Sequence, residues 1–171
     1  MNEYTIKPKE SFPEKIGEFV WMLEHVREVT LQEVATLTQS ELDFLPSDGA
    51  NSIGSLLVHI ASIEFVHQVI SFENRDLTKG EHSKWGTALE LGDRARDEIV
   101  HHPLDYYLKH LAQVREKKRT LLKLKNDQWL YEENQWGNGI AYNHYYLWFH
   151  VMEDEINHRG QIRSIKRLLG K

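Results

Sequence analysis

The sequence of 171 residues contains no cysteine. Disulfide bonds, zinc sites built on thiolates and a nucleophilic protein thiol are therefore all excluded, and any thiol chemistry would need a thiol from a small molecule. Positive charge is also scarce, because 21 lysine and arginine residues stand against 26 acidic residues and give a net charge of −5. Binding to a phosphate backbone needs clustered positive charge, so we expect no nucleic-acid partner. The one basic run, Arg115–Lys125, is spaced against leucines and is interpreted as the solvated face of a helix.

Long apolar runs are missing as well. No uninterrupted apolar run approaches the roughly 20 residues that cross a membrane. The segment Met1–Glu10 is polar and lacks the apolar core of a signal peptide. We therefore expect a cytoplasmic protein without a membrane partner. A chain of this length fits a single domain, residues 1–171, and is long enough to bury about 70% of its unfolded surface.

Apolar residues recur at the 3.6-residue spacing of amphipathic helices in four segments. The predicted helices span about 11–37, 51–72, 103–122 and 142–169. Ser11 and Glu14 can form a capping box at the first start, Pro103 suits the first turn of the third helix, and Gly170 ends the fourth. No segment has the sequence pattern of a β-strand, so the predicted class is all-α.

Two polar stretches separate these helices. Residues 73–101 contain three glycines and no sustained period, and residues 126–139 form a loop that carries two tryptophans. Links between neighbouring helices of a bundle mostly have two to eight residues. The first stretch therefore predicts a crossover that makes the third helix parallel to the second. The predicted fold is a four-helix bundle with a long crossover between helices two and three.

Potential metal ligands occur in two of the predicted helices. His59 lies among aliphatic residues, where an imidazole is either a hydrogen-bonded core histidine or a ligand, because its ring nitrogens need partners. His150, Asp154 and His158 are four residues apart, so each step drifts only about 40° around the helix. Adjacent members of this strip can clamp one ion. A polar helix face with local hydrogen bonds has the same pattern.

Two short motifs resemble those of the DinB-like family of metalloenzymes, which includes bacterial thiol transferases of the YfiT type. One motif is the run Gly54–Glu64 around His59, and the other is His-Arg-Gly-Gln at 158–161 with a ligand-capable residue four positions earlier. The resemblance covers most of the chain. It implies a four-helix bundle with a long crossover, a small-molecule substrate and a homodimer.

By this resemblance the metal ligands are His59, Asp154 and His158, with His150 in reserve as an alternative ligand or a partner of the ligands. The family usually has a histidine at the position of Asp154, and an aspartate reaches less far. The ion would then lie nearer the last helix, be bridged by a water, or be held more weakly. Two imidazoles and one carboxylate can hold a divalent ion, zinc or nickel first and iron or manganese next, and leave positions open. No catalytic base is identified.

The residues beside the ligands are interpreted as structural. Gly160 would allow close helix packing, and Arg159 would pair with a neighbouring helix, with Glu64 as one recipient. Glu155 points about 100° away from the ligand strip, where it would be solvated or interfacial. His67, eight residues after His59, would be a histidine of the core or its rim.

The resemblance favours a divalent-metal-dependent enzyme that transfers a low-molecular-weight thiol to a small electrophile. A divalent ion can lower the pKa of a bound thiol or water and so generate a nucleophile near neutral pH. Hydrolysis or isomerisation at the same open site is a variant of this hypothesis. The alternative is a non-catalytic, stress-associated helical bundle that binds a metal or an apolar ligand without turnover.

Overall fold

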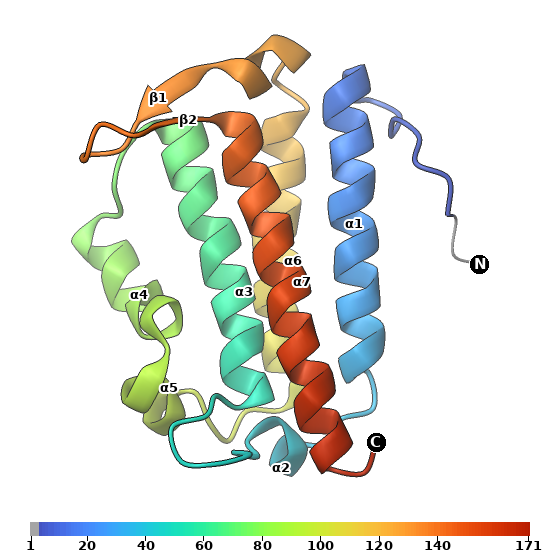
Figure 1. Cartoon of the computed structure of the whole chain (residues 1–171), viewed down its shortest axis with the longest axis vertical. Helices are drawn as coiled ribbons and strands as arrows, with labels where there is room; N and C mark the ends of the chain where they lie inside the picture. The colour runs from blue at the N-terminus through green and yellow to red at the C-terminus, as the bar shows by residue number, and fades with distance from the viewer. Residues whose placement is uncertain (1–3) are drawn as a thin grey trace.

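The computed structural model describes residues 4–171, whose four long helices form a bundle (Figure 1). In Figure 1, helices α1 and α7 run downward and helices α3 and α6 run upward, so that α3 and α6 are parallel. The predicted all-α bundle with a crossover between its second and third long helices is confirmed. The four helices are α1 (Glu14–Val34), α3 (Ile53–Gln68), α6 (Leu104–Leu122) and α7 (His144–Leu168).

The crossover between α3 and α6 contains more regular structure than its sequence predicts. Helix α3 continues into the π-helix η1 (Val69–Glu73), which is followed by α4 (Lys79–Glu90) and α5 (Gly92–Glu98). Thr78 and Glu81 form a capping box that starts α4. The helical period is hard to see in the sequence because few residues of α4 are buried, namely Trp85, Gly86 and Ala88.

Helix α1 begins differently from the prediction. Pro13 occupies the N-cap and makes no side-chain hydrogen bond, so the predicted capping box of Ser11 is wrong. Ser11 instead has a left-handed backbone with φ of 71°. The backbone N–H groups of Lys15 and Ile16 donate to the carboxylate of Asp127 at 3.2 and 3.0 Å. A carboxylate distant in sequence thus satisfies two free donors and complements the positive end of the helix dipole.

The remaining elements close the two ends of the bundle. Helix α2 (Gln39–Leu42) lies at the lower end in Figure 1. The segment predicted as a loop, residues 126–139, contains the 3₁₀-helix η2 (Asp127–Tyr131) and strand β1 (Glu133–Gln135). Strand β1 pairs antiparallel with β2 (Ala141–Asn143), which corrects the prediction that the chain has no strand.

The two helices that carry the candidate ligands begin at polar caps. The side chain of Ser52 accepts a hydrogen bond from the N–H of Ser55, so α3 starts where the sequence predicts. Asn143 accepts from the N–H of Tyr146 at 2.8 Å, and α7 therefore begins two residues later than predicted. Gly170, with φ of 77°, follows the end of α7 as expected.

Helix α3 is the central helix of the bundle. Together with η1 it forms a stretch of 21 residues, Ile53–Glu73, whose most apolar window has a mean hydropathy of 1.5. By length and composition this stretch could cross a membrane. However, 78% of its most apolar window is buried inside the protein, where α3 packs against α4, α6 and α7. Its hydropathy is therefore explained by its place in the core. The buried polar side chains His59 and Glu64 interrupt this apolar stretch.

Candidate metal centre

The structure brings His59 of α3 together with Asp154 and His158 of α7. One donor atom from each residue lies within 4.8 Å of the other two, and no other trio of this kind occurs within residues 4–171. Nε2 of His158 and Nε2 of His59 lie 3.2 and 3.7 Å from the same carboxylate oxygen, Oδ1 of Asp154. The two rings stand edge to face, with centroids 4.6 Å apart. The predicted ligand set is therefore one spatial cluster.

Helix α4 fixes the ring of His59. Nδ1 of His59 lies 2.8 Å from the carbonyl oxygen of Ala88. Because a carbonyl oxygen can only accept, Nδ1 carries a proton, and Nε2 is the ring nitrogen turned toward Asp154. Metal-binding histidines are commonly held in this way through their second ring nitrogen. The crossover is thus part of the site, a contact that the sequence did not reveal.

Two further polar atoms of the cluster are buried without a partner. Oδ2 of Asp154 and Nδ1 of His158 make no hydrogen bond within the described part of the chain. A buried polar atom left unpaired costs roughly 1–3 kcal/mol, and more when the group is charged. Two imidazoles and a carboxylate are ordinary donors for zinc and other first-row divalent ions. The residues present therefore fit a divalent cation.

Asp154 is held in its ionised form. Burial on its own would raise the pKa of this carboxyl group, but the hydrogen bonds and charges of His158 and His59 outweigh burial and hold the pKa well below its usual range. A cation binds the ionised form of a carboxyl group. The side chain is only 12% exposed. Short as it is, this aspartate comes within 4 Å of both histidines.

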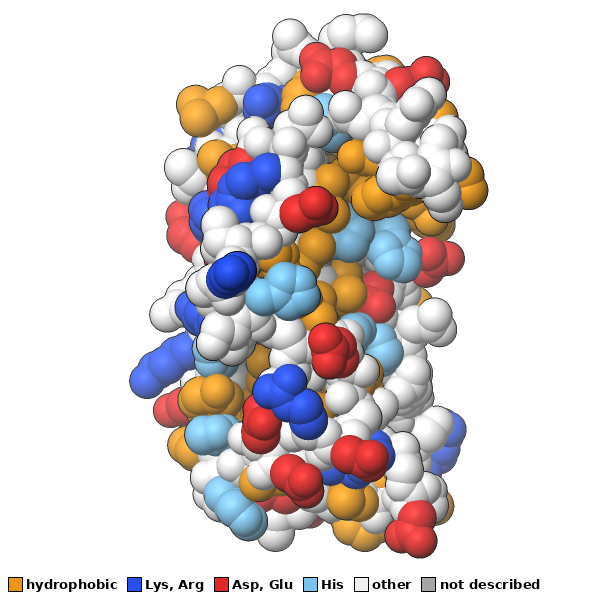
Figure 2. Space-filling view, turned by 90° about the vertical axis from the view of Figure 1, so that its left-hand side faces the viewer, with side chains coloured by type: hydrophobic (Ala, Val, Ile, Leu, Met, Phe, Trp, Pro, Cys, Tyr) orange, Lys and Arg blue, Asp and Glu red, His pale blue; other side chains and the backbone are white. Residues whose placement is uncertain are grey.

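His150, the reserve ligand, lies outside the cluster. Its side chain is 39% exposed, and its Nδ1 lies 3.4 Å from Oε2 of Glu153. Its ring is 5.4 Å, centroid to centroid, from the ring of His67, which is buried on α3. Several histidines gather beside hydrophobic side chains along the middle of the face that α4 and α5 border (Figure 2).

A buried ion-pair network ties the four long helices together. Arg27 of α1 donates from Nε to Glu155 of α7 at 2.8 Å and from Nη2 to Glu64 of α3 at 3.0 Å. Arg115 of α6 donates from Nε to Glu64 at 2.9 Å and from Nη2 to Glu155 at 3.1 Å. Burial on its own would raise the pKa of Glu64, but Arg115, Lys118 and Arg27 lower it to about 2. Each long helix contributes one residue to these pairs, so they fix the helices relative to one another.

The sequence analysis missed this network. The predicted solvated face of Arg115–Lys125 is wrong at Arg115 and Lys118, which are both buried. Of the two alternatives predicted for Glu155, solvated or interfacial, the solvated one is wrong, because its exposure is 0%. Glu155 lies at the interface of α7 with α1 and α6, where it accepts from Arg27 and Arg115. A charged residue at a helical spacing from apolar core residues is the signal that could have indicated this network. Arg27, for example, follows Leu23 by four residues and therefore lies on the apolar face of α1.

Two other structural predictions need correction. Arg159 donates to the backbone carbonyl of Val26 at 3.0 Å and not to Glu64, whose oxygens already accept from Arg27 and the other cations of the network. Gly160 is exposed, and no atom lies within 4 Å of the position where a Cβ would stand. It therefore plays no part in close helix packing.

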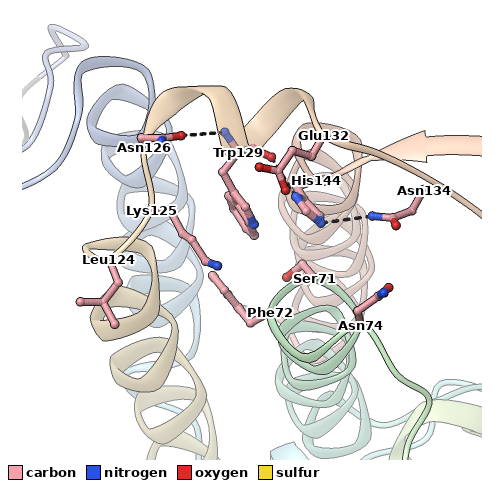
Figure 3. A pocket seen from close by; sticks show the side chains of 10 residues that line it. All are labelled: Ser71, Phe72, Asn74, Leu124, Lys125, Asn126, Trp129, Glu132, Asn134 and His144. Atoms are coloured by element: carbon pink, nitrogen blue, oxygen red, sulfur yellow. Dashed lines mark hydrogen bonds between the residues drawn. The ribbon is translucent and has the colours of Figure 1, made fainter.

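A separate polar pocket of about 370 Å³ lies under η2, at the end of the bundle (Figure 3). The rings of Phe72 and Trp129 stack there at 4.9 Å, and Nζ of Lys125 lies 5.7 and 5.4 Å from their centroids. Nδ1 of His144 lies 2.8 Å from the carbonyl oxygen of Trp129. His144 precedes Asp154 by ten residues, roughly 15 Å along α7. This pocket is therefore distinct from the metal centre.

Several solved structures have similar folds, and three of them are compared with this chain. YfiT from Bacillus subtilis, described as a probable metal-dependent hydrolase with an unusual four-helix bundle topology, is 19% identical with a TM-score of 0.62, over 99% of this chain and 95% of that one. A DinB-like protein from Bacillus cereus is 17% identical with a TM-score of 0.61, over 90% and 91%. The colibactin self-resistance protein ClbS, in complex with double-stranded DNA, is 12% identical with a TM-score of 0.65, over 89% and 95%. Likeness at these identities shows a shared fold.

The sequence itself gives the family. No curated protein sequence matches this chain. The model of the mycothiol-S-transferase family, however, matches residues 18–169. This range includes every candidate ligand and all four long helices, apart from the first turn of α1. In agreement with the DinB-like motifs around His59 and at 158–161, the chain belongs to the mycothiol-S-transferase family.

Proposed function

We propose that this protein is a divalent-metal-dependent transferase that joins a low-molecular-weight thiol to a small electrophile. The observation that carries the proposal is the cluster of His59, Asp154 and His158, in which Nε2 of both imidazoles approaches one carboxylate oxygen. Two further polar atoms of these residues, Oδ2 of Asp154 and Nδ1 of His158, are buried without partners in the described chain. Three protein ligands leave coordination positions open, which a reacting molecule needs.

Two further features support a thiol as the nucleophile. The family to which the chain belongs is named for the transfer of a small thiol. The chain has no cysteine, so a thiol in the site would come from a substrate and would not compete with a protein thiol for the ion. In the reaction the S–H bond breaks, a C–S bond forms, and the leaving group departs with the proton.

The protein would supply the ligands and their orientation. A divalent cation held there would lower the pKa of a bound thiol and make it nucleophilic near neutral pH. Ala88 fixes the ring of His59, and the ionised Asp154 brings a negative charge to a site whose three side chains are only 10–14% exposed. Nitrogen and carboxylate donors favour zinc or nickel, with iron and manganese as alternatives.

A second candidate function is hydrolysis. The similar structure of YfiT is described as a probable metal-dependent hydrolase, and the same open site would equally lower the pKa of a bound water. The thiol reaction is preferred because the family model covers most of the chain, whereas the likeness to YfiT is one of fold. A bundle that binds a metal or an apolar ligand without turnover is the third outcome that experiments should separate.

Metal analysis of protein purified without an affinity tag tests the site itself. We expect near-stoichiometric metal in the wild type and its loss in His59→Ala and His158→Ala. A matched control is His101→Asn, which removes an 83% exposed imidazole and places a tolerant residue at a left-handed position with φ of 63°. The control should retain as much metal as the wild type. If neither the wild type nor the control contains bound metal, the metal-dependent hypothesis is rejected.

Turnover needs its own assay. Metal-loaded and metal-stripped protein would be incubated with small thiols and electrophiles, and the products measured by mass spectrometry. The proposal expects a thioether product that depends on both thiol and metal, whereas a hydrolase would consume the electrophile without thiol. Product formation that survives stripping would reject the mechanism. Asp154→His should tighten metal binding, because imidazole is a longer ligand with good affinity for zinc.

The setting of this reaction is also part of the proposal. The net charge of −5 supports a small-molecule substrate and argues against nucleic acid, although ClbS was crystallised with DNA. A homodimer in the cytoplasm stays a prediction, which light scattering of the purified protein and cell fractionation would check.

A further inference from the structure

A second pair of histidines meets between α3 and α7, as His59 and His158 do. His67 lies two turns after His59 on α3, and His150 lies one turn before Asp154 on α7. The His67 and His150 centroids are 5.4 Å apart, compared with 4.6 Å for His59 and His158. Two imidazoles that share a tetrahedral ion at about 2.0–2.1 Å have centroids roughly 5 Å apart. Both pairs therefore have a spacing that suits one shared cation.

The histidines of the second pair also present suitable nitrogens. His67 is only 7% exposed, and its Nδ1 lies 2.7 Å from the carbonyl oxygen of Ile63, so Nδ1 carries the proton and Nε2 keeps its lone pair. This repeats the way in which Ala88 holds His59. Nδ1 of His150 faces the carboxylate of Glu153, which leaves its Nε2 as the ligand atom. Such partners on the second nitrogen are typical of metal-binding histidines.

In the sequence of α7, Asp154 lies midway between His150 and His158. The steps from His150 to Asp154 and from Asp154 to His158 are both four residues, so one strip of α7 contains two adjacent clamps. Oδ1 of Asp154 is the oxygen that approaches His59 and His158, whereas Oδ2 is buried and has no partner in the described chain. An ionised carboxylate has two oxygens with about four acceptor positions, so it can serve two cations at once.

We propose that Asp154 bridges two divalent-cation sites. The first is formed by His59, His158 and Oδ1, and the second by His67, His150 and Oδ2 of the same carboxylate. The second site is the more open one, because His150 is 39% exposed and only the first trio has all its donors within 4.8 Å. Its cation should therefore be bound more weakly and exchange faster. The thiol reaction proposed above needs only the first cation, so the second site is an addition to it.

Titration of the stripped, full-length protein with cobalt(II) tests this proposal. Visible absorption reports the coordination of each ion, and metal analysis after gel filtration counts the ions. We expect saturation at two equivalents, the first bound more tightly than the second. His67→Gln should saturate at one equivalent with the absorption of the first site unchanged. Saturation of the wild type at one equivalent, or two equivalents in His67→Gln, would overturn the proposal.

Two controls keep the result interpretable. His101→Asn removes an exposed imidazole away from the site and should still bind two equivalents of cobalt. If this variant loses one ion, the second ion binds adventitiously at the surface, which also overturns the proposal. Circular dichroism and thermal unfolding of His67→Gln show whether the fold is intact, and His150→Gln, altered at an exposed position, repeats the test with little risk to folding. Because the assay counts ions and no turnover is measured, failure of the thiol reaction and failure of the second site are separate outcomes.

Discussion

Lys118 allows a quantitative test of how charge is accommodated in the core. Its side chain has 0% exposure and lies in the network of Arg27 and Arg115 with Glu64 and Glu155, where three cations meet two carboxylates. Its Nζ is 3.6 Å from Glu64 and makes no hydrogen bond in the described part of the chain. The two arginines already satisfy both carboxylates, so the lysine is a surplus buried charge.

The magnitude follows from the pKa of Lys118. Burial, and after it the charge of Arg115, lowers this pKa from 10.5 to about 7. The unfolded chain therefore binds more protons between pH 7 and 10.5, so the lysine destabilises the fold below that range and the free energy of unfolding rises as the pH increases through it. A shift of this size corresponds to at most roughly 5 kcal/mol. Lys118→Met removes this penalty but also the attraction to Glu64 at 3.6 Å, so we expect a net gain below that limit, about 1–4 kcal/mol at pH 7.

Urea unfolding of the chelator-treated proteins at pH 7 and pH 9 measures this effect. Wild type should be more stable at pH 9 than at pH 7, and the advantage of Lys118→Met should shrink at pH 9. The matched control is Lys117→Met, at a neighbouring position whose side chain is 49% exposed, and it should change stability by less than about 0.5 kcal/mol. A Lys118→Met protein that is less stable than wild type at pH 7, or whose advantage is the same at both pH values, would refute the surplus-charge argument.

Two further substitutions test local packing and capping. Gly54→Ala should lower the free energy of unfolding by about 1–3 kcal/mol, because its Cβ would lie 2.6 Å from the hydroxyl oxygen of the buried Tyr107. Gly160→Ala is the control, because nothing lies within 4 Å of its Cβ position. Equal thermal stability of the two variants would contradict the predicted clash. Asp127→Ala removes the acceptor of two backbone N–H groups at the start of α1 and should cost about 0.5–2 kcal/mol in urea unfolding. An unchanged midpoint would show that water replaces this carboxylate.

Local sequence features predicted the elements whose causes are local. The start of α3 was predictable because Ser52 caps it within three residues, and the long helices because their apolar periods are visible in one window. The start of α1 was not, because its acceptor, Asp127, lies 111 residues away from Ile16 in the sequence. Helix α4 was missed because its few buried residues leave no apolar stripe.

The same distinction applies to the candidate site. The four-residue spacing of Asp154 and His158 is local, and the family resemblance added His59 from another helix. The contact of His59 with the carbonyl of Ala88 could not be predicted, because a backbone acceptor has no signature in the side-chain sequence. Glu155 looked solvated because its partners, on α1 and α6, become neighbours only in the folded chain.

The buried ion pairs and the candidate ligands are linked through two consecutive residues. Asp154 and Glu155 point about 100° apart on α7, so that one faces the histidines and the other faces Arg27 and Arg115 in the core. A rotation of α7 that moved Asp154 away from His59 would also break the two ion pairs of Glu155, at 2.8 and 3.1 Å. Breaking a buried pair costs about 3–5 kcal/mol. The network therefore holds the short aspartate where it reaches both imidazoles, and the position of the ligand depends on charges that lie outside the metal centre.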